Sequence, residues 1–399
     1  MKSNYEPLGK HIRLVDHRNS EEVTSTVLGI SIDKEFMPSV ANVIGTDLSR
    51  YKLISKGLFA CNPMHVGRDE RLPIALYEKD NASIVSPAYF MFEIIDRDVL
   101  NEEYLMMWFR RPEFDRECWF MTDGSVRGGI TWDDLCRIQL PVPPYERQLD
   151  VVESYRAITR RIAMKKEIND NLAKTIKAVF KSWFLDFDAF DGVELVQSQY
   201  GLIPNGWHYE LLGNLCDCVT KGTTPTTLGK DFTDTGINFI KGESINDDHS
   251  FNKTLFAHID DETDELLKRS RIYVNDIVFT IAGTLGKFAL VDGSVIPANT
   301  NQAVAIIRTS KIMPAMLYSY FIGEWQVEFY KRNTQQAVQA NLSLGTIKDL
   351  PILLPDSKGQ DHYMQLVTPL IVGMQNNFSE IERLYELQNQ LLARLSSSR

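Results

Sequence analysis

The chain has 399 residues, of which 44% are hydrophobic and 24% charged, so we expect a globular protein of two to three domains. No apolar run approaches the ~20 residues of a membrane-spanning helix, and no signal peptide is visible, which predicts a cytoplasmic protein without membrane contact. The net charge of −10 excludes a protein that coats DNA through overall charge, but a local basic face stays possible.

Residues 1–144 are predicted to form a first domain of mixed α/β (α+β) class. Strand-like runs occupy positions 83–86 and 88–94, where β-branched and aromatic residues are frequent. Turn-forming residues separate such runs. We therefore expect a compact domain rather than a helical extension.

Residues 145–192 are predicted to form a central helix. Pro143 and Pro144 mark its start, because proline is tolerated in a first helical turn, and no glycine or proline follows from Tyr145 to Leu185. Apolar residues recur every three or four positions along one face. This stripe includes Ile162, Leu172, Ile176, Val179 and Trp183.

Residues 193–355 are predicted to form a linker and a second mixed domain. Turn residues and weak periodicity between Ala189 and Gly206 mark the connection. Further strand-like runs occupy 272–274, 276–281 and 303–307.

Residues 356–399 are predicted to form a second long helix. Its apolar positions follow steps of three and four with a polar member at Gln388, and they are Ile381, Leu384, Leu391 and Leu395. Pro369 and Gly373 predict a kink or a late start. Since neither long helix can hide its stripe alone, we expect the two to pack together, antiparallel if a pseudo-two-fold axis relates the halves.

An internal repeat supports this organisation. The segment 138–143 is followed by Gln148, and the similar segment 350–355 is followed by Gln360, at a constant separation of 212 positions. Ile130-Thr131 and Leu342-Ser343 share this separation. The sequence therefore predicts two copies of one module.

The fronts of the two copies differ. Residues 5–9 match residues 209–213 at a separation of 204 positions, but the blocks 10–90 and 214–300 share little beyond strand-like patterns. A variable front on a common back is typical of two modules that do the same task on different targets.

Catalytic motifs are not supported. Val142-Pro-Pro-Tyr145 resembles an amino-methyltransferase loop, but valine has no acceptor for the target amine. The run Gly283–Lys287 resembles the end of a phosphate loop, but Ile281 and Phe288 occupy essential positions. The seven histidines and five cysteines show no metal-ligand spacing. We expect no catalytic residue, no metal and no cofactor.

Polar side chains suited to base edges remain. In the first half the candidates are Arg68, Arg71, Ser125 and Arg127. In the second half, the segment 221–227 is rich in short donors, and the candidates there are Lys221, Thr223, Thr224 and Lys230. The amide candidates come from the run 299–302 and from a later run, and they are Asn299, Asn301, Gln302, Gln335, Gln336 and Gln339.

Over nearly its whole length, the chain resembles the specificity subunit of type I restriction–modification enzymes. The most specific stretches are Lys181–Asp188, which contains Trp-Phe-Leu-Asp-Phe, the entry Gly201–Trp207, and Gly222-Thr-Thr-Pro225 shortly after it. The duplicated proline anchor with glutamine five residues later also matches.

The resemblance implies a non-catalytic subunit whose two target recognition domains each read one half of a split site in double-stranded DNA. It implies that the two helices form an antiparallel coiled coil that sets the gap. It also implies that two modification subunits and further restriction subunits are partners. The first front departs from the pattern because it lacks a Gly-Thr-Thr-Pro equivalent, so its reading loop is not placed by the resemblance.

Two other functions stay open from the sequence. A coiled-coil scaffold that binds proteins rather than DNA explains the helices and the acidic charge, but not variable fronts on a common back. A self-contained DNA enzyme is disfavoured because methyl-donor and nuclease motifs are missing. Binding of random duplex and methylation by the isolated chain distinguish these alternatives.

Overall fold

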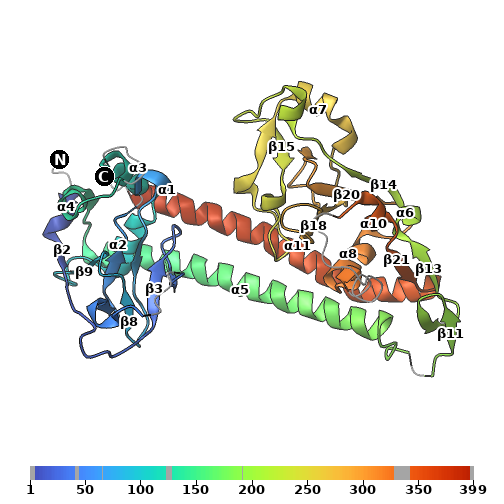
Figure 1. The fold of residues 1–399 in the computed structure, drawn as a ribbon, viewed down its shortest axis with the longest axis horizontal. Coiled ribbons are helices and arrows are strands. Elements are labelled where there is room, and N and C mark those ends of the chain that lie inside the picture. The colour runs from blue at the N-terminus through green and yellow to red at the C-terminus, as the bar shows by residue number, and fades with distance from the viewer. Residues whose placement is uncertain are drawn as a thin grey trace. The chain divides into compact units, whose positions relative to one another are not determined.

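The computed structural model describes residues 5–40, 45–64, 66–122, 128–190, 192–327 and 342–395. By its contacts the chain divides into two compact units, and each long helix contributes to both (Figure 1). Unit 1 consists of residues 1–162 and 382–399, and unit 2 consists of residues 163–381. The domain boundaries expected from the sequence remain a prediction. Among the described residues, none of the helices combines the length and apolar character that spanning a membrane requires.

The described residues of unit 1 form three sheets and four short α-helices. The chain enters through β1 (Tyr5–Pro7), which pairs antiparallel with β10 (Gln139–Pro141). An antiparallel sheet has the order β2 (Ile12–Leu14), β9 (Phe90–Ile94), β6 (Phe59–Cys61) and β7 (Ile74–Leu76). A further sheet has the order β4 (Phe36–Pro38), β3 (Val27–Ile30), β8 (Ser83–Val85) and β5 (Lys52–Ile54), with β3 parallel to β8. The α-helices are α1 (Val66–Asp69), α2 (Glu102–Phe109), α3 (Pro112–Phe120) and α4 (Trp132–Arg137), and the 3-10 turns are η1 (Leu8–Lys10) and η2 (Leu48–Arg50).

Unit 2 has a matching set of sheets. Its entry strand β13 (His208–Leu211) pairs antiparallel with β21 (Pro351–Leu354). An antiparallel sheet has the order β14 (Cys216–Lys221), β20 (Val304–Thr309), β17 (Ile277–Thr280) and β18 (Phe288–Leu290). The third sheet has the order β16 (Ala257–Ile259), β15 (Ile237–Ile240) and β19 (Ala298–Thr300), with β15 parallel to β19. An additional hairpin joins β11 (Leu195–Ser198) to β12 (Gly201–Pro204).

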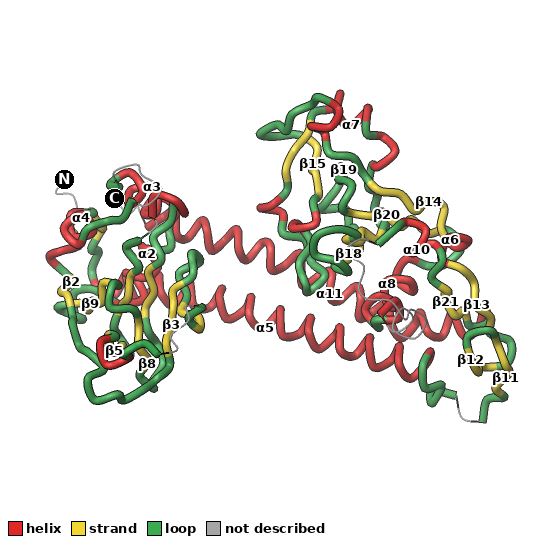
Figure 2. Tube along the Cα trace, in the orientation of Figure 1, coloured by secondary structure: helices red, strands yellow, loops and turns green. Residues whose placement is uncertain are grey.

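The α-helices of unit 2 outside the long pair are α6 (Leu212–Leu215), α7 (Asp261–Leu266), α8 (Pro314–Ile322) and α10 (Leu344–Lys348). Its 3-10 turns are η3 (Pro225–Leu228), η4 (Gly242–Ser244), η5 (Lys253–Leu255) and η6 (Lys268–Ser270). Figure 2 shows that both units mix strands with short helices, which confirms the predicted mixed class.

The two units share one topology. The order β2-β9-β6-β7 corresponds to β14-β20-β17-β18, and the order β4-β3-β8 corresponds to β16-β15-β19 with the same single parallel pair. Within the described residues, unit 1 adds the edge strand β5 to this sheet. The variable fronts, which look unrelated in sequence, are therefore the same fold. The predicted internal repeat is confirmed.

Backbone contacts at the entry strands repeat as well. The amide of Leu8 donates to the carbonyl of Ile138 at 2.8 Å, and the amide of Leu212 donates to the carbonyl of Leu350 at 2.8 Å. Each front thus closes on the strand that precedes a long helix. In each unit, the first and last strands of the domain therefore lie side by side, just before the long helix begins.

The proline anchors work through their glutamines. Gln148 Nε2 donates to the carbonyl of Pro143 at 2.9 Å, and Gln360 Nε2 donates to the carbonyl of Pro355 at 2.9 Å. In both units, the carbonyl of the proline just before the long helix thus accepts a hydrogen bond from a glutamine side chain. The equal spacing of the two glutamines reflects this shared contact.

Short helices before the anchors are capped alike. The Thr131 hydroxyl accepts from the amide of Asp134 at 3.1 Å, and the Ser343 hydroxyl accepts from the amide of Thr346 at 3.0 Å. Such N-caps satisfy one of the free amides at a helix start, and each contributes about 1 kcal/mol. They explain why hydroxyl residues stand at equivalent positions in the two copies.

The long helices are α5 (Tyr145–Phe184) and α11 (Ser357–Arg394). In unit 2, Ile176 and Trp183 of α5 share one buried cluster with Val367 of α11. In unit 1, Tyr155 of α5 shares a cluster with Leu392 of α11. Early residues of one helix meet late residues of the other, so the pairing is antiparallel, as predicted. The nine apolar positions singled out from the sequence are buried or half-buried: Ile162, Leu172, Ile176, Val179, Trp183, Ile381, Leu384, Leu391 and Leu395.

Of the two alternatives expected at Pro369, the late start of α11 is wrong, and the kink remains a prediction. The helix begins at Ser357 and contains Pro369. Tyr363 and Val367 are fully buried in the turns before the proline. A proline within a helix removes one backbone hydrogen bond, and tertiary packing of the apolar face outweighs this loss here.

A buried polar layer interrupts the apolar seam in unit 2. Asn169 and Asn377 are 4% and 8% exposed, and Asn377 Nδ2 donates to Asn169 Oδ1 at 2.7 Å. Asn169 Nδ2 donates to the carbonyl of Met374 at 3.2 Å. Lys165 Nζ donates to Asn377 Oδ1 at 3.0 Å and pairs with Glu380 at 2.7 Å. The two helices therefore satisfy each other's buried amides.

Replacing one asparagine of this layer should cost more than replacing both. We expect Asn169→Leu to lower the free energy of unfolding by about 1–3 kcal/mol, because the Asn377 amide loses its acceptor in a buried site. The double variant with Asn377→Leu should recover part of this loss. Urea unfolding followed by circular dichroism measures the coupling.

An exposed pair on the same helices provides the control. Gln388 Nε2 donates to Thr159 Oγ1 at 2.9 Å in an exposed position, so Gln388→Leu should change the free energy of unfolding by less than about 0.5 kcal/mol. Additive effects of the two asparagine substitutions would contradict the proposed coupling.

Candidate nucleic-acid interface

A close approach of two loops defines the candidate site in unit 2. The chain leaves β14 at Lys221, and the amide of Gly222 donates to the carbonyl of Asn301 at 3.0 Å. A Cβ atom at Gly222 would lie 1.7 Å from the carbonyl oxygen of Thr300. Only glycine fits such a contact. The segment 221–224 and the segment 301–303 are called the unit 2 loop pair below.

Five of the candidate residues predicted from the sequence meet at this loop pair. They are Lys221, Thr223, Thr224, Asn301 and Gln302. Thr224 Oγ1 donates to Gln302 Oε1 at 2.5 Å, which joins the two loops through side chains. Lys221 and Gln302 are exposed, and the other three are half-buried. Hydroxyl, amide and ammonium groups are thus presented together at one strand edge, as base-edge recognition requires.

Lys230 lies close to the loop pair but has a partner. Its amide donates to the carbonyl of Pro225 at 3.2 Å, and its Nζ pairs with Glu262 at 2.7 Å. The hydrogen bond that Lys230 donates to the Glu262 carboxylate raises the pKa of Lys230 above its ordinary value. The carboxylate offsets the positive charge that the sequence prediction relied on.

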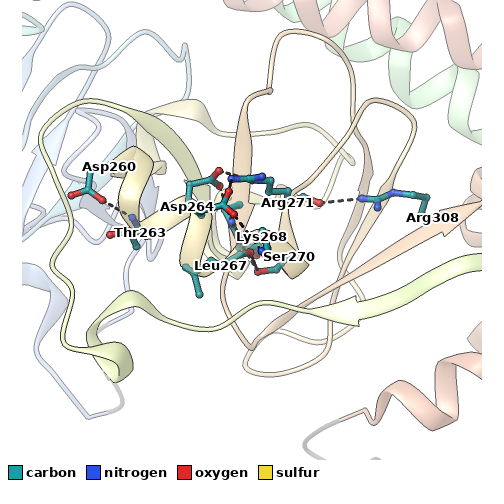
Figure 3. Close-up of polar contacts among 11 residues, drawn as sticks. Asp260, Thr263, Asp264, Leu267, Lys268, Ser270, Arg271 and Arg308 are labelled. Atoms are coloured by element: carbon teal, nitrogen blue, oxygen red, sulfur yellow. Dashed lines mark hydrogen bonds and ion pairs between the residues drawn. The ribbon is translucent and has the colours of Figure 1, made fainter.

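The prediction that Asn299 contacts bases is wrong, because this side chain is fully buried. Its Nδ2 donates to Asp264 Oδ1 at 2.9 Å, and its Oδ1 accepts from Ser270 Oγ at 2.7 Å. Asp264 also pairs with Arg271 at 2.6 Å (Figure 3). Asn299 therefore holds β19 in place beneath the loop pair rather than facing a ligand.

The arginines predicted for the first half lie on or beside α1. Arg68 pairs with Asp69 at 2.6 Å, and Arg71 pairs with Asp33 at 3.3 Å. Both side chains are about half exposed. The remaining candidates lie outside the described residues: Ser125, Arg127, Gln335, Gln336 and Gln339.

The sequence prediction missed the counterpart of the loop pair in unit 1. There the amide of Val15, just after β2, donates to the carbonyl of Met91 at 2.8 Å. Asp16 and Arg18 form an ion pair at 2.7 Å in the same segment. The only sequence signal is a polar run after alternating Ile12 and Leu14, and no glycine motif marks it.

Metal-dependent chemistry finds no support in the described part of the chain. Within those residues, no group of three or more histidine, cysteine or acidic side chains is placed to hold a metal ion. The described cysteines are free thiols, and burial raises the pKa of Cys216 to about 12. Thiolate chemistry at neutral pH is therefore disfavoured at this position.

Comparison with known proteins gives a consistent result. Residues 204–382 match the family model described as the type I restriction modification DNA specificity domain. The chain is 23% identical over 308 residues to the MjaIX type I restriction enzyme specificity subunit of Methanocaldococcus jannaschii, covering 76% of this chain and 70% of that protein. It is 22% identical over 381 residues to the HindI specificity subunit of Haemophilus influenzae, covering 79% of this chain and 78% of that protein.

Together these matches indicate a specificity subunit of a type I restriction–modification enzyme. Among solved structures, the type I restriction–modification S subunit from M. genitalium aligns with a TM-score of 0.52 and 14% identity, over 98% of this chain and 95% of that one, and so shares the fold. The predicted resemblance is confirmed, and the alternative of a scaffold without a DNA role is not favoured. The chain is the specificity part of such an enzyme rather than a catalytic part.

Substitution of Gly222 tests the loop pair of this specificity subunit. We expect Gly222→Ala to lower the stability of unit 2 by about 2–3 kcal/mol, because the new methyl group must displace the Thr300 carbonyl. Thermal unfolding of the chain and its DNA affinity within a methyltransferase complex provide the measurement.

Gly293→Ala is the matched control, because a Cβ atom at Gly293 meets nothing within 4 Å. Equal behaviour of the two alanine variants would show that the loops do not pack as described.

Proposed function

We propose that this specificity subunit recognises a bipartite site in double-stranded DNA, with unit 1 reading one half and unit 2 the other. The observation that carries the proposal is the repetition of one fold with different side chains at its loops. The entry strands, proline anchors and helix caps repeat. A shared frame with differing edges is what two readers of different sequences require.

The chemistry of the unit 2 loop pair supports DNA as the ligand. Gln302 carries an amide that can both donate to and accept from a base edge, and Thr224 carries a hydroxyl with the same capacity. The overall charge of −10 provides no general attraction to phosphates. We therefore propose that partner subunits supply part of the phosphate contacts and that this chain supplies the sequence readout.

The long helices are proposed to set the gap between the half-sites. Helix α5 has 40 residues, which corresponds to roughly 60 Å at 1.5 Å per residue. Its apolar seam and the Asn169–Asn377 layer fix its pairing with α11. Because one DNA base pair advances about 3.4 Å, a spacer built from paired helices is stiff enough to define a gap in whole base pairs.

The similarity to specificity subunits of type I restriction enzymes supports partner subunits for this chain. We propose that two modification subunits, which use S-adenosylmethionine, bind to the helical pair, because the module occurs twice. Restriction subunits join this assembly for cleavage. The complex would work in the cytoplasm, where its DNA substrate is accessible.

Exchange of one module tests the proposal. Residues 1–144 are replaced by the corresponding residues of another specificity subunit, and the altered chain is assembled with its modification subunits. We expect one half of the methylated motif to change while the other half and the gap stay the same. Sequencing of methylated positions in a randomised DNA library gives the result. A change in both halves would contradict independent reading by the two units.

A further inference from the structure

We propose that unit 1 reads its half-site at the edge formed by residues 16–19 and 86–89, with Arg18 as the side chain that contacts a guanine edge in the major groove. This inference rests on the proposed function and assigns it to residues that the sequence did not single out. Residues 16–19 and 86–89 are called the unit 1 loop pair below. Arg68 and Arg71 are thereby replaced as the first candidates.

Topology places the unit 1 loop pair. Strand β2 pairs with β9 in unit 1 as β14 pairs with β20 in unit 2, with Leu14 opposite Phe92 and Lys221 opposite Ala305. The loop after β2 is therefore the counterpart of the loop after β14. The loop that joins β8 to β9 is likewise the counterpart of the loop that joins β19 to β20. Both members of the unit 2 loop pair have an equivalent in unit 1.

The backbone carbonyls of Tyr89 and Asn301 occupy equivalent positions in the two loop pairs. Tyr89 and Asn301 are 212 positions apart, which is the separation of the repeat. The Asn301 carbonyl accepts from the amide of Gly222, whereas the Tyr89 carbonyl accepts from Lys52 Nζ at 2.6 Å. A lysine side chain satisfies in unit 1 the group that a glycine amide satisfies in unit 2.

The backbone of the unit 1 loop pair is held firmly. The amide of Leu53 donates to the carbonyl of His17 at 2.9 Å, and the amide of Asn19 donates to the carbonyl of Tyr51 at 2.9 Å. Between these two hydrogen bonds, the backbone of Arg18 pairs with that of Lys52 in an isolated antiparallel β-bridge. The segment after β2 thus runs along the edge strand β5, which has no counterpart among the described strands of unit 2. These backbone contacts fix the position of the Arg18 Cα atom.

The Arg18 guanidinium is oriented before any ligand binds. Its Nη1 donates to the carbonyl of Arg50 at 2.9 Å, and its Nη2 pairs with Asp16 at 2.7 Å. The side chain is nevertheless 39% exposed. A guanidinium has five N–H donors in a rigid fork, so donors remain for two acceptors such as guanine O6 and N7. Orientation by Asp16 lowers the entropy cost of such a bidentate contact.

The charge at this edge suits an electronegative ligand. Arg18 and Lys52 both lie next to Asp16, at 2.7 and 3.8 Å, so the group carries one more positive than negative charge. Lys52 is 11% exposed in its side chain, which leaves Arg18 as the accessible cation. Arg68 is likewise paired with a carboxylate, that of Asp69, so pairing alone does not separate the two arginines. Arg18 is preferred because it lies on the loop that corresponds to the segment after β14.

The test measures base discrimination by the complete methyltransferase complex on a randomised DNA library. We expect Arg18→Ala to reduce discrimination at one position of the first half-site by roughly 10- to 100-fold, and to leave the second half-site unchanged. Arg18→Lys keeps the charge but not the bidentate fork, so it should lose most of the same discrimination. Arg137→Ala is the matched control, because Arg137 is also an exposed arginine paired with a carboxylate, at 2.8 Å from Asp134. The Arg137→Ala variant should discriminate bases in both half-sites as well as the unaltered chain does.

The outcomes separate the two proposals. If the unaltered complex shows no bipartite motif, the proposed function fails. If it shows one and Arg18→Ala changes neither half, or weakens binding equally for all sequences as loss of a phosphate contact would, the assignment of Arg18 to base reading is overturned. Assembly with the modification subunits and thermal unfolding are measured for every variant. A misfolded Arg18→Ala protein leaves Arg18→Lys as the deciding variant, and unchanged discrimination in that variant also overturns the assignment.

Discussion

Burial of two apolar stripes that neither long helix can hide alone is the constraint on which this structure depends. Helices α5 and α11 cover each other's seams, antiparallel, and each unit packs its own core onto one end of the pair. The buried Asn169–Asn377 contact adds a polar requirement to an otherwise apolar seam. Polar seam positions reduce stability but select one register over its alternatives. The Asn169–Asn377 contact therefore favours one register of α5 against α11 over other registers of the apolar seam.

The recognition modules attach to this spacer through contacts that are the same in both copies. An entry strand closes on the strand before the helix, and a glutamine satisfies the carbonyl of the anchoring proline. None of these contacts uses a residue of the loop pairs. Side chains at the loops can therefore change without disturbing attachment. The frame is therefore shared by the two copies while the loop side chains differ.

The sequence predicts the parts of this fold whose signals are local or repeated. The helix period, the proline anchors and their glutamines are visible because each reflects a contact within a few residues. Pro369 misleads, since burial of Tyr363 and Val367 outweighs its local effect. Asn299 and Asn301 look alike in sequence, but pairing of β15 with β19 buries the first and leaves the second at the loop. The unit 1 loop pair is invisible for the same reason, because it depends on pairing of Leu14 with Phe92 and on Lys52, which lies far from both along the chain.

One module, present twice and joined by the paired helices, is proposed to read two separate stretches of DNA. The most direct measurement is a map of methylated bases in the genome of cells that carry this chain with its modification partner, compared with cells that lack it. We expect one motif with two specified blocks and an invariant number of unspecified bases between them. A single uninterrupted block, or blocks whose separation varies from site to site, would contradict it.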